Sequence, residues 1–248
     1  GKHAVLIGME NAFPLGENLK DVNLWAERGV RYMGITHFGH NQFGDSSNPS
    51  TDRNETTSKW NGLSPLGREL ISSLNDAGII VDVSHAAKST MMQAADLSRV
   101  PVIASHSGIK AINDNPRNLD DEQLLKLKET GGVVQVVAYG SYVKGFTEEQ
   151  KKIEARLMSE FNVLSRSDVN GLDEDKKIQF EQARAELLKM EPLASVSDYV
   201  DHIDYAVKIA GIDHVGIASD FDGGGGVIGW QDVSETQNIT AELIKRGY

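Results

Sequence analysis

Short runs of apolar, mostly β-branched residues alternate along this chain with segments in which apolar residues recur at helical spacing. Continuous apolar runs of this length are typical of parallel strands that are covered on both faces. We therefore expect six buried strands, and the sequence contains no internal repeat. The expected strands are Ala4–Gly8, Val30–Thr36, Ile79–Val83, Val100–Ala104, Val133–Ala138 and Val215–Ser219.

The segments between these runs predict helices. Ser64 and Pro65 are residue types preferred at an N-cap and at the first helical position, and Gly78 is suited to end that helix. Strands that alternate with helices indicate either a (β/α) barrel or a doubly wound sheet. A barrel has eight strands, so two of them are not accounted for by the six runs. Further helices are expected over Asp21–Gly29, Ala87–Leu97, Asp120–Glu129 and Ser197–Ala210, and from Thr240 towards Arg246.

Residues 146–190 differ from the rest of the chain. Glu and Lys are interleaved there at helical spacing on both sides of a turn near Asn170 and Gly171. Mixed charge runs on a helix are usually solvated faces. We expect a two-helix insertion without catalytic residues, placed within a single domain over residues 1–248.

Composition narrows the choice of partners. The formal net charge of −11 disfavours nucleic acid and anionic membrane surfaces. The chain has no Cys, which excludes disulfides, thiol catalysis and Cys-ligated zinc. No apolar run is long enough to span a bilayer. The opening residues predict a strand rather than a signal peptide. The compartment, periplasmic/extracytoplasmic or cytoplasmic in a bacterium, therefore stays open.

Two histidines follow apolar runs in the stretch from Ile79 to Ser107. Strand, helix and strand in so short a span predict a βαβ unit with parallel, neighbouring strands. His85 and His106 then lie at the carboxyl ends of adjacent strands, where barrels and open α/β sheets place their chemistry. Two imidazoles there suit a divalent metal. A pair of hydrogen-bonded loop histidines is the alternative interpretation.

Three further polar residues follow the ends of other expected strands: Glu10, His37 and Asp220. In a parallel barrel they converge with the two histidines on one rim, although they are far apart in sequence. Asp220 and Asp222 both precede a run of glycines and are also suited to forming a turn. We prefer Asp220 as the functional residue because of its place at the strand end.

The segments around these residues resemble the membrane (renal-type) dipeptidase family, whose members are zinc dipeptidases on an amidohydrolase-type barrel. The resemblance covers nearly all of the chain outside residues 146–190. It implies a (β/α)8 TIM-type barrel with six of its eight strands in this chain. The matching segments are IGMEN at 7–11, ITH at 35–37, GLSPLGRELISSLNDAGIIVDVSH at 62–85, PVIASHS at 101–107, PRN at 116–118 and GIASDFDGG at 216–224.

The resemblance also implies a zinc cofactor, with two ions in the complete enzyme, and a role for six residues. The implied roles are Glu10 as the carboxylate that bridges the two zinc ions, His85 and His106 as ligands of the second zinc, His37 and Arg117 as substrate contacts, and Asp220 as the catalytic acid/base.

The implied reaction is hydrolysis of a dipeptide by a metal-bound hydroxide that attacks the peptide carbonyl. Asp220 then passes a proton to the leaving amine, and an N–H of His37 stabilises the tetrahedral oxyanion. Arg117 is suited to form a fork to the C-terminal carboxylate of the substrate. A loop salt bridge is the alternative for Arg117. Small dipeptides are the expected partners, and a homodimer is an open possibility.

One departure from the family pattern concerns the first zinc ion. The family carries a His-x-Asp pair on its first strand, and no such pair precedes Glu10. The motif at 202–204 has the spacing but lies within a predicted helix. We therefore expect two upstream strands outside this sequence, and an incomplete folding unit without them. Structural or surface roles are expected for the remaining histidines, which are His3, His40, His202 and His214.

Two other functions stay open. One is a different amidohydrolase-type hydrolase, acting on N-acyl amino acids or lactams. The other is a non-catalytic binding protein on a degenerate barrel, which is favoured only if the His-x-Asp pair is truly absent.

Overall fold

The computed structural model describes residues 3–51, 53–163, 166–190 and 193–248. Six parallel strands form one sheet, in the same order as they occur along the chain. This sequential parallel order is that of a half-barrel, so the predicted fold class is confirmed. The strands are β1 (Ile7–Met9), β2 (Val30–Gly34), β3 (Ile80–Asp82), β4 (Ile103–Ser107), β5 (Val133–Val137) and β6 (Val215–Ala218).

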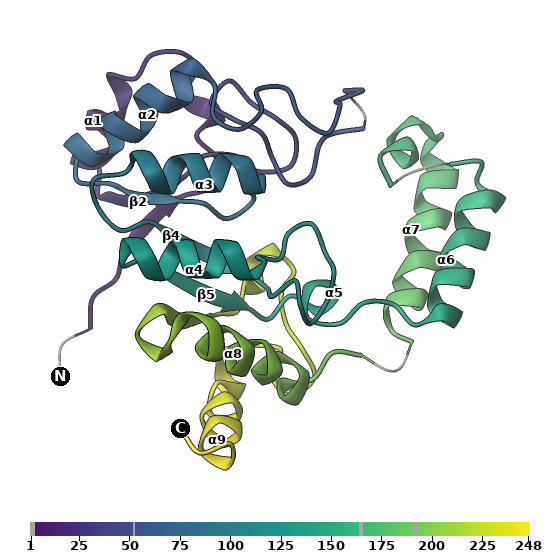
Figure 1. Cartoon of the computed structure of the whole chain (residues 1–248). Helices are drawn as coiled ribbons and strands as arrows, with labels where there is room; N and C mark the ends of the chain where they lie inside the picture. The colour runs from purple at the N-terminus through teal and green to yellow at the C-terminus, as the bar shows by residue number, and fades with distance from the viewer. Residues whose placement is uncertain (1–2, 52, 164–165, 191–192) are drawn as a thin grey trace.

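Helices follow the strands and pack against one another beside the sheet. Figure 1 shows α2, α3, α4 and α8 in a row along it, each next to the helix before it in the row. The helices are α1 (Asp21–Glu27), α2 (Pro65–Asp76), α3 (Lys88–Leu97), α4 (Asp121–Thr130), α5 (Gly140–Val143), α6 (Glu148–Glu160), α7 (Glu174–Leu188), α8 (Val196–Ala210) and α9 (Gln237–Lys245). Among the described residues, none of the helices combines the length and the apolar character needed to cross a membrane.

The helix ends follow from their local sequence. The Ser64 side chain accepts a hydrogen bond from the amide of Gly67, which makes it the predicted N-cap of α2. Asp120 precedes α4 and forms a capping box with Gln123. Gly131 ends α4 at a φ of 74°, a left-handed conformation that glycine adopts without a Cβ penalty.

The main core lies between the sheet and the helix row. Leu70, Ile71 and Leu74 of α2 are completely buried, as the apolar stripe of that helix predicts. Leu124 and Leu127 of α4 are buried in the same core.

The first strand differs from its prediction. A strand over Ala4–Gly8, covered on both faces, is wrong: β1 contains only Ile7–Met9, and Val5 is 89% exposed. Within these 248 residues β1 pairs only with β2 and lies at one edge of the sheet, as β6 lies at the other, so no other strand of this sequence covers its outer side.

The α6/α7 hairpin corresponds to the predicted helical insertion. Figure 1 shows these two helices side by side and projecting away from the sheet. They enclose a small core of their own, made by Leu157, Val163, Val169 and Phe180.

The long loop between β2 and α2 is held in place by one buried carboxylate. Asp45 is 1% exposed and accepts hydrogen bonds from the amides of Lys59, Trp60 and Gly62. The Ser58 hydroxyl donates a further hydrogen bond to Asp45. The loop thus gains a fixed shape although it has no regular secondary structure.

Candidate metal centre

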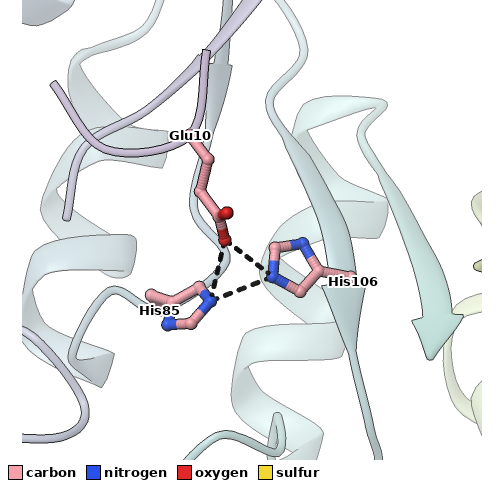
Figure 2. Close-up of side chains that lie close together, drawn as sticks. All are labelled: Glu10, His85 and His106. Carbon is pink, nitrogen blue, oxygen red and sulfur yellow. Dashed lines mark hydrogen bonds and ion pairs between the residues drawn. The ribbon is translucent and has the colours of Figure 1, made fainter. Parts of the chain in front are cut away.

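Three side chains that are distant in sequence meet at the carboxyl edge of the sheet. Glu10 directly follows β1, His85 follows β3, and His106 lies near the end of β4. Because the strands are parallel, their carboxyl ends lie at one edge, so the three side chains reach one point. Figure 2 shows the Glu10 carboxylate and the two imidazoles pointing toward one another.

The three donor atoms form a nearly equilateral triangle. Glu10 Oε1 lies 3.1 Å from His85 Nε2 and 3.2 Å from His106 Nε2, and the two nitrogens are 3.0 Å apart. Ligands at about 2.0–2.1 Å from a tetrahedral zinc ion are separated by about 3.3 Å. The triangle therefore fits one face of a tetrahedral zinc site, with a fourth position left for another ligand.

The charges of the three groups also suit a cation. Contacts with His106 and His85 hold the pKa of Glu10 well below its ordinary value, so this carboxylate is ionised at neutral pH. Burial lowers the pKa of His85 to about 3, which keeps its imidazole neutral. An ionised carboxylate and a neutral imidazole are the forms in which these side chains ligate metals.

The backbone is strained at the same place. Asn11, His85 and Asp220 have φ values of 72°, 65° and 57°, in the left-handed region that residues other than glycine seldom adopt. Such conformations cost about 1–3 kcal/mol each and cluster at functional sites. In His85 this conformation accompanies the sharp turn by which the chain leaves β3.

His37 lies beside this cluster. Its Nε2 is 3.6 Å from Glu10 Oε1, and its ring centroid is 4.1 Å from that of His85. Burial lowers the pKa of His37, so the ring is neutral and retains one N–H to donate. His37 therefore lies next to the donor triangle but is not one of its three donors.

Arg117 is a buried cation next to His106. Only 3% of the residue is exposed, and its Nη2 donates to the His106 carbonyl over 3.2 Å. Its guanidinium lies 5.4 Å from the centre of the Tyr142 ring. Within the described part of the chain, Arg117 has no carboxylate within salt-bridge distance, and its buried Nε has no hydrogen-bond partner. The loop salt bridge considered for Arg117 is therefore not formed with any described residue.

Asp220 follows β6 and is half-buried at the same rim. Burial raises the pKa of Asp220 above its ordinary value, against the opposing influence of His106. A Cβ on Gly223 would lie 2.3 Å from Asp220 Oδ1, so a side chain at this position would displace the carboxylate. Asp220 does not belong to the donor triangle, and Asp222 is exposed.

The remaining histidines have other surroundings. His202 lies inside α8, where its Nδ1 accepts from the Ile109 amide and its Nε2 donates to the Val143 carbonyl. His40 Nε2 lies 2.9 Å from the Thr56 carbonyl oxygen, within the loop between β2 and α2. Neither belongs to the metal-binding cluster, and the His-x-Asp spacing at 202–204 lies on a helix, as expected.

Two residues near His106, the buried Asp82 and the partly buried Ser105, were not predicted from the sequence. Ser105 Oγ lies 2.8 Å from His106 Nδ1, and Ser105 in turn donates to Asp82. A charged residue inside the apolar run Ile79–Val83 was the available signal, because a carboxylate in a buried strand needs a specific partner.

A comparison with known proteins now identifies the family. The family model described as membrane dipeptidase (peptidase family M19) matches residues 1–248. The chain belongs to the membrane dipeptidase family. This confirms the resemblance seen in the sequence.

Two curated proteins that are named dipeptidases resemble this chain along its whole length. The chain is 31% identical over 248 residues to the dipeptidase aclJ of Aspergillus oryzae, matching 100% of this chain and 47% of the relative. It is 30% identical to the dipeptidase tcpJ of Claviceps purpurea, again over 100% of this chain and 47% of the relative. The chain thus spans about half the length of the curated relatives that it matches.

Solved structures agree with the family fold. The crystal structure of the probable dipeptidase PvdM from Pseudomonas aeruginosa has a TM-score of 0.91 at 41% identity, covering 100% of this chain and 65% of that one. A metallo peptidase from Rhodobacter sphaeroides, liganded with a phosphinate mimic of L-Ala-D-Ala, has a TM-score of 0.71 at 24% identity, covering 98% of this chain and 57% of that one. The second likeness concerns the fold alone.

Proposed function

We propose that this chain carries the metal-binding rim of a zinc-dependent dipeptidase with a binuclear site. The single observation that carries the proposal is the triangle of Glu10, His85 and His106, whose edges of 3.0–3.2 Å fit a zinc ion. Family membership supports the same function. Zinc is preferred because its protein sites combine imidazole and carboxylate ligands in this geometry.

Glu10 is suited to bridge two cations. Its contacts with His37, His85 and His106 all involve Oε1, which leaves Oε2 for a second ion. Among the described residues, no second cluster of three metal-binding side chains exists, so the other ligands of that ion are not among them. When bound, the cations supply Lewis acidity toward the substrate carbonyl and lower the pKa of water.

The surrounding residues orient the substrate and move protons. Arg117 is a buried guanidinium without a carboxylate partner among the described residues, and a substrate C-terminal carboxylate would supply one. The His37 N–H donates to the oxygen that becomes negative during attack on the peptide carbonyl. Asp220, whose pKa is raised by burial, takes up the proton lost by the attacking water and delivers it to the leaving amine.

The proposed function is tested by restoring zinc to the metal-free protein and comparing its activity on three substrates. Metal-free protein that includes the expected upstream strands is reloaded with zinc, and hydrolysis is compared for a dipeptide, the same dipeptide with an amidated C-terminus, and an N-acyl amino acid. We expect cleavage of the free dipeptide, with kcat/KM lowered by at least about tenfold on amidation, since a charge-assisted pair is worth about 1.5–3 kcal/mol. Preferred cleavage of the N-acyl amino acid would support the alternative hydrolase, and zinc binding without any hydrolysis would support a binding protein.

Arg117→Lys tests the substrate role separately. Lysine keeps the charge but loses the bidentate fork, so kcat/KM for the free dipeptide should fall and the value for the amidated dipeptide should change little. Equal losses on both substrates would remove Arg117 from the carboxylate site.

A further inference from the structure

We propose that Asp82 and Ser105 are positioning residues that fix the proton of His106 on Nδ1 and thereby direct its Nε2 lone pair at the metal position. The inference rests on the proposed function, because it concerns how one ligand of that metal is oriented. We call the chain of hydrogen bonds from Asp82 through Ser105 to His106 the relay.

The relay begins at a buried carboxylate. Asp82 is 2% exposed, and its Oδ1 accepts from the amides of Ser84 and Ser105, each at 3.0 Å. Its Oδ2 accepts from the Ser105 hydroxyl at 2.5 Å. Asp82 is the acceptor in all three of these hydrogen bonds. The hydroxyl proton of Ser105 is therefore committed to Asp82.

The direction of the next hydrogen bond follows. With its proton engaged, Ser105 Oγ can only accept from His106 Nδ1, which lies 2.8 Å away. A neutral imidazole carries one N–H, so a proton on Nδ1 leaves a lone pair on Nε2. That lone pair points at the space shared with Glu10 Oε1 at 3.2 Å and His85 Nε2 at 3.0 Å, where a cation would accept it. Without a cation, Glu10 and Ser105 compete for the same His106 proton, and the short contact with Ser105 favours Nδ1.

His85 provides a contrast within the same cluster. Its Nδ1 is buried and has no hydrogen-bond partner among the described atoms, so on the side away from Glu10 no hydrogen bond holds the His85 ring. His106 is thus the member of the pair whose lone pair is set in advance. Partners that fix a ligating histidine in this way typically change metal affinity by about 10–100-fold when removed.

Sheet register supplies the geometry. Asp82 ends β3 and pairs with Ile103 of β4, so Ser105 lies two residues further along the neighbouring strand and on the same face. Ser84 Oγ accepts from the His106 amide at 2.9 Å and holds the backbone at this point. The relay therefore needs only two adjacent parallel strands.

The decisive variant is Asp82→Asn, because it reverses the relay. The amide oxygen of Asn replaces Oδ1, which accepts two backbone N–H groups, and the NH₂ group replaces Oδ2. The NH₂ group donates to Ser105 Oγ, whose proton then turns to His106 Nδ1 and moves the imidazole proton to Nε2. Long-range ¹H–¹⁵N NMR of the metal-free protein should show the Nδ1–H tautomer of His106 in the wild type and the Nε2–H tautomer in this variant.

Zinc affinity gives the second readout, measured by competition with a chromogenic chelator. Asp82→Asn and Ser105→Ala should each weaken zinc binding by about 10–100-fold, and Ser105→Thr, which keeps the hydroxyl, should restore it. Ser107→Ala is the matched control, since Ser107 is a completely buried serine of the same strand whose hydroxyl contacts Ser84 rather than the His106 ring. It should change the dissociation constant by less than about threefold.

Two results would overturn the inference: a wild-type His106 with its proton on Nε2, or equal losses of zinc affinity in Ser105→Ala and Ser107→Ala. Failure of the proposed function is distinguishable, because a wild type that binds no zinc still reports the His106 tautomer. If Ser105→Ala does not fold, the wild-type spectrum and Ser105→Thr decide the question.

Discussion

The carboxyl rim of the half-barrel and the α6/α7 hairpin are held together by different kinds of contact. At the rim, single interactions join residues that are far apart in sequence, such as Glu10 with His106 and with His85. In the hairpin, ion pairs among the described residues, such as Lys151–Glu148 and Lys189–Glu186, join residues three positions apart on one helix. The rim therefore depends on contacts between elements that are far apart in the sequence, whereas the hairpin is held together by contacts among residues that are close in the sequence.

This difference indicates that the hairpin and the metal-binding rim are stabilised independently. The hairpin core of Leu157, Val163, Val169 and Phe180 is separate from the main core, and no member of the metal-binding cluster lies in the hairpin. At its base, Gln150 caps α6 together with Thr147 and donates to the Met190 carbonyl. We therefore expect substitutions in the hairpin core to destabilise the hairpin without weakening metal binding. Substitutions of the metal-binding residues should weaken metal binding without destabilising the hairpin.

The largest effect is expected at the rim. Glu10→Ala removes the corner of the donor triangle that carries the negative charge. Zinc binding should weaken by more than about 100-fold, because the loss of a direct ligand exceeds that of its supporting hydrogen bonds. Chelator competition measures the affinity. Phe180→Ala in the hairpin is the control and should leave the zinc affinity unchanged. A comparable loss of zinc affinity in that variant would contradict the separation of the two regions.

The same contrast explains what could be predicted from the sequence. Helix boundaries at Ser64, Asp120 and Gly131 depend on neighbouring residues, so their local signals were sufficient. The five polar residues at strand ends were found because parallel strands share one carboxyl edge.

Other features depend on contacts that sequence alone does not reveal. The exposure of β1 follows from which strands lie beside it, since an apolar run looks the same at the edge and in the middle of a sheet. The link from Asp82 through Ser105 to His106 requires the register between β3 and β4. Likewise, the hydrogen bonds of His202 to Ile109 and Val143 span 93 and 59 positions in sequence.

A second prediction compares the two cores. Leu74→Ala should lower the free energy of unfolding of the half-barrel by about 2–5 kcal/mol, because Leu74 is completely buried and the cavity collapses only in part. Phe180→Ala should destabilise the hairpin alone. All three tryptophans, Trp25, Trp60 and Trp230, lie outside residues 146–190, so their fluorescence in urea reports the half-barrel. Hydrogen exchange over α6 and α7 reports the hairpin.

The alternative is that the half-barrel and the hairpin unfold together. If the two cores form one cooperative unit, Phe180→Ala will shift the tryptophan transition as far as Leu74→Ala does. A shift of the hydrogen exchange alone supports two separable regions.

A third prediction concerns pH. Burial lowers the pKa of His202, while the Val143 carbonyl acts in the opposite direction, as do Asp201 and Asp198 on the same helix. The unfolded chain then binds more protons than the folded one, so stability falls as pH drops below about 6.5. The slope from this one group is at most about 1.4 kcal/mol per pH unit.

The comparison is between metal-free wild type and His202→Gln, which does not titrate. Urea unfolding between pH 5 and 7.5 should show a shallower loss of stability in the variant, whatever its stability at pH 7.5. Residues 146–190 contain no histidine, so hydrogen exchange of the hairpin should vary little over this range beyond the intrinsic pH dependence of exchange. Parallel curves for the two proteins would show that His202 does not contribute.

The smallest effect is expected from the ion pairs of the hairpin. Lys151 and Glu148 are 59% and 82% exposed, so water screens their attraction and the chain loses entropy by holding them together. Lys151→Ala should therefore change the opening free energy of α6 by less than about 0.5 kcal/mol, with alanine's helix propensity offsetting part of the loss. Thr147→Ala should cost about 1 kcal/mol, because it removes the side chain that caps the Gln150 amide. Hydrogen exchange of α6 measures both. If Lys151→Ala costs as much as Thr147→Ala, surface charge rather than capping and the small core holds the hairpin.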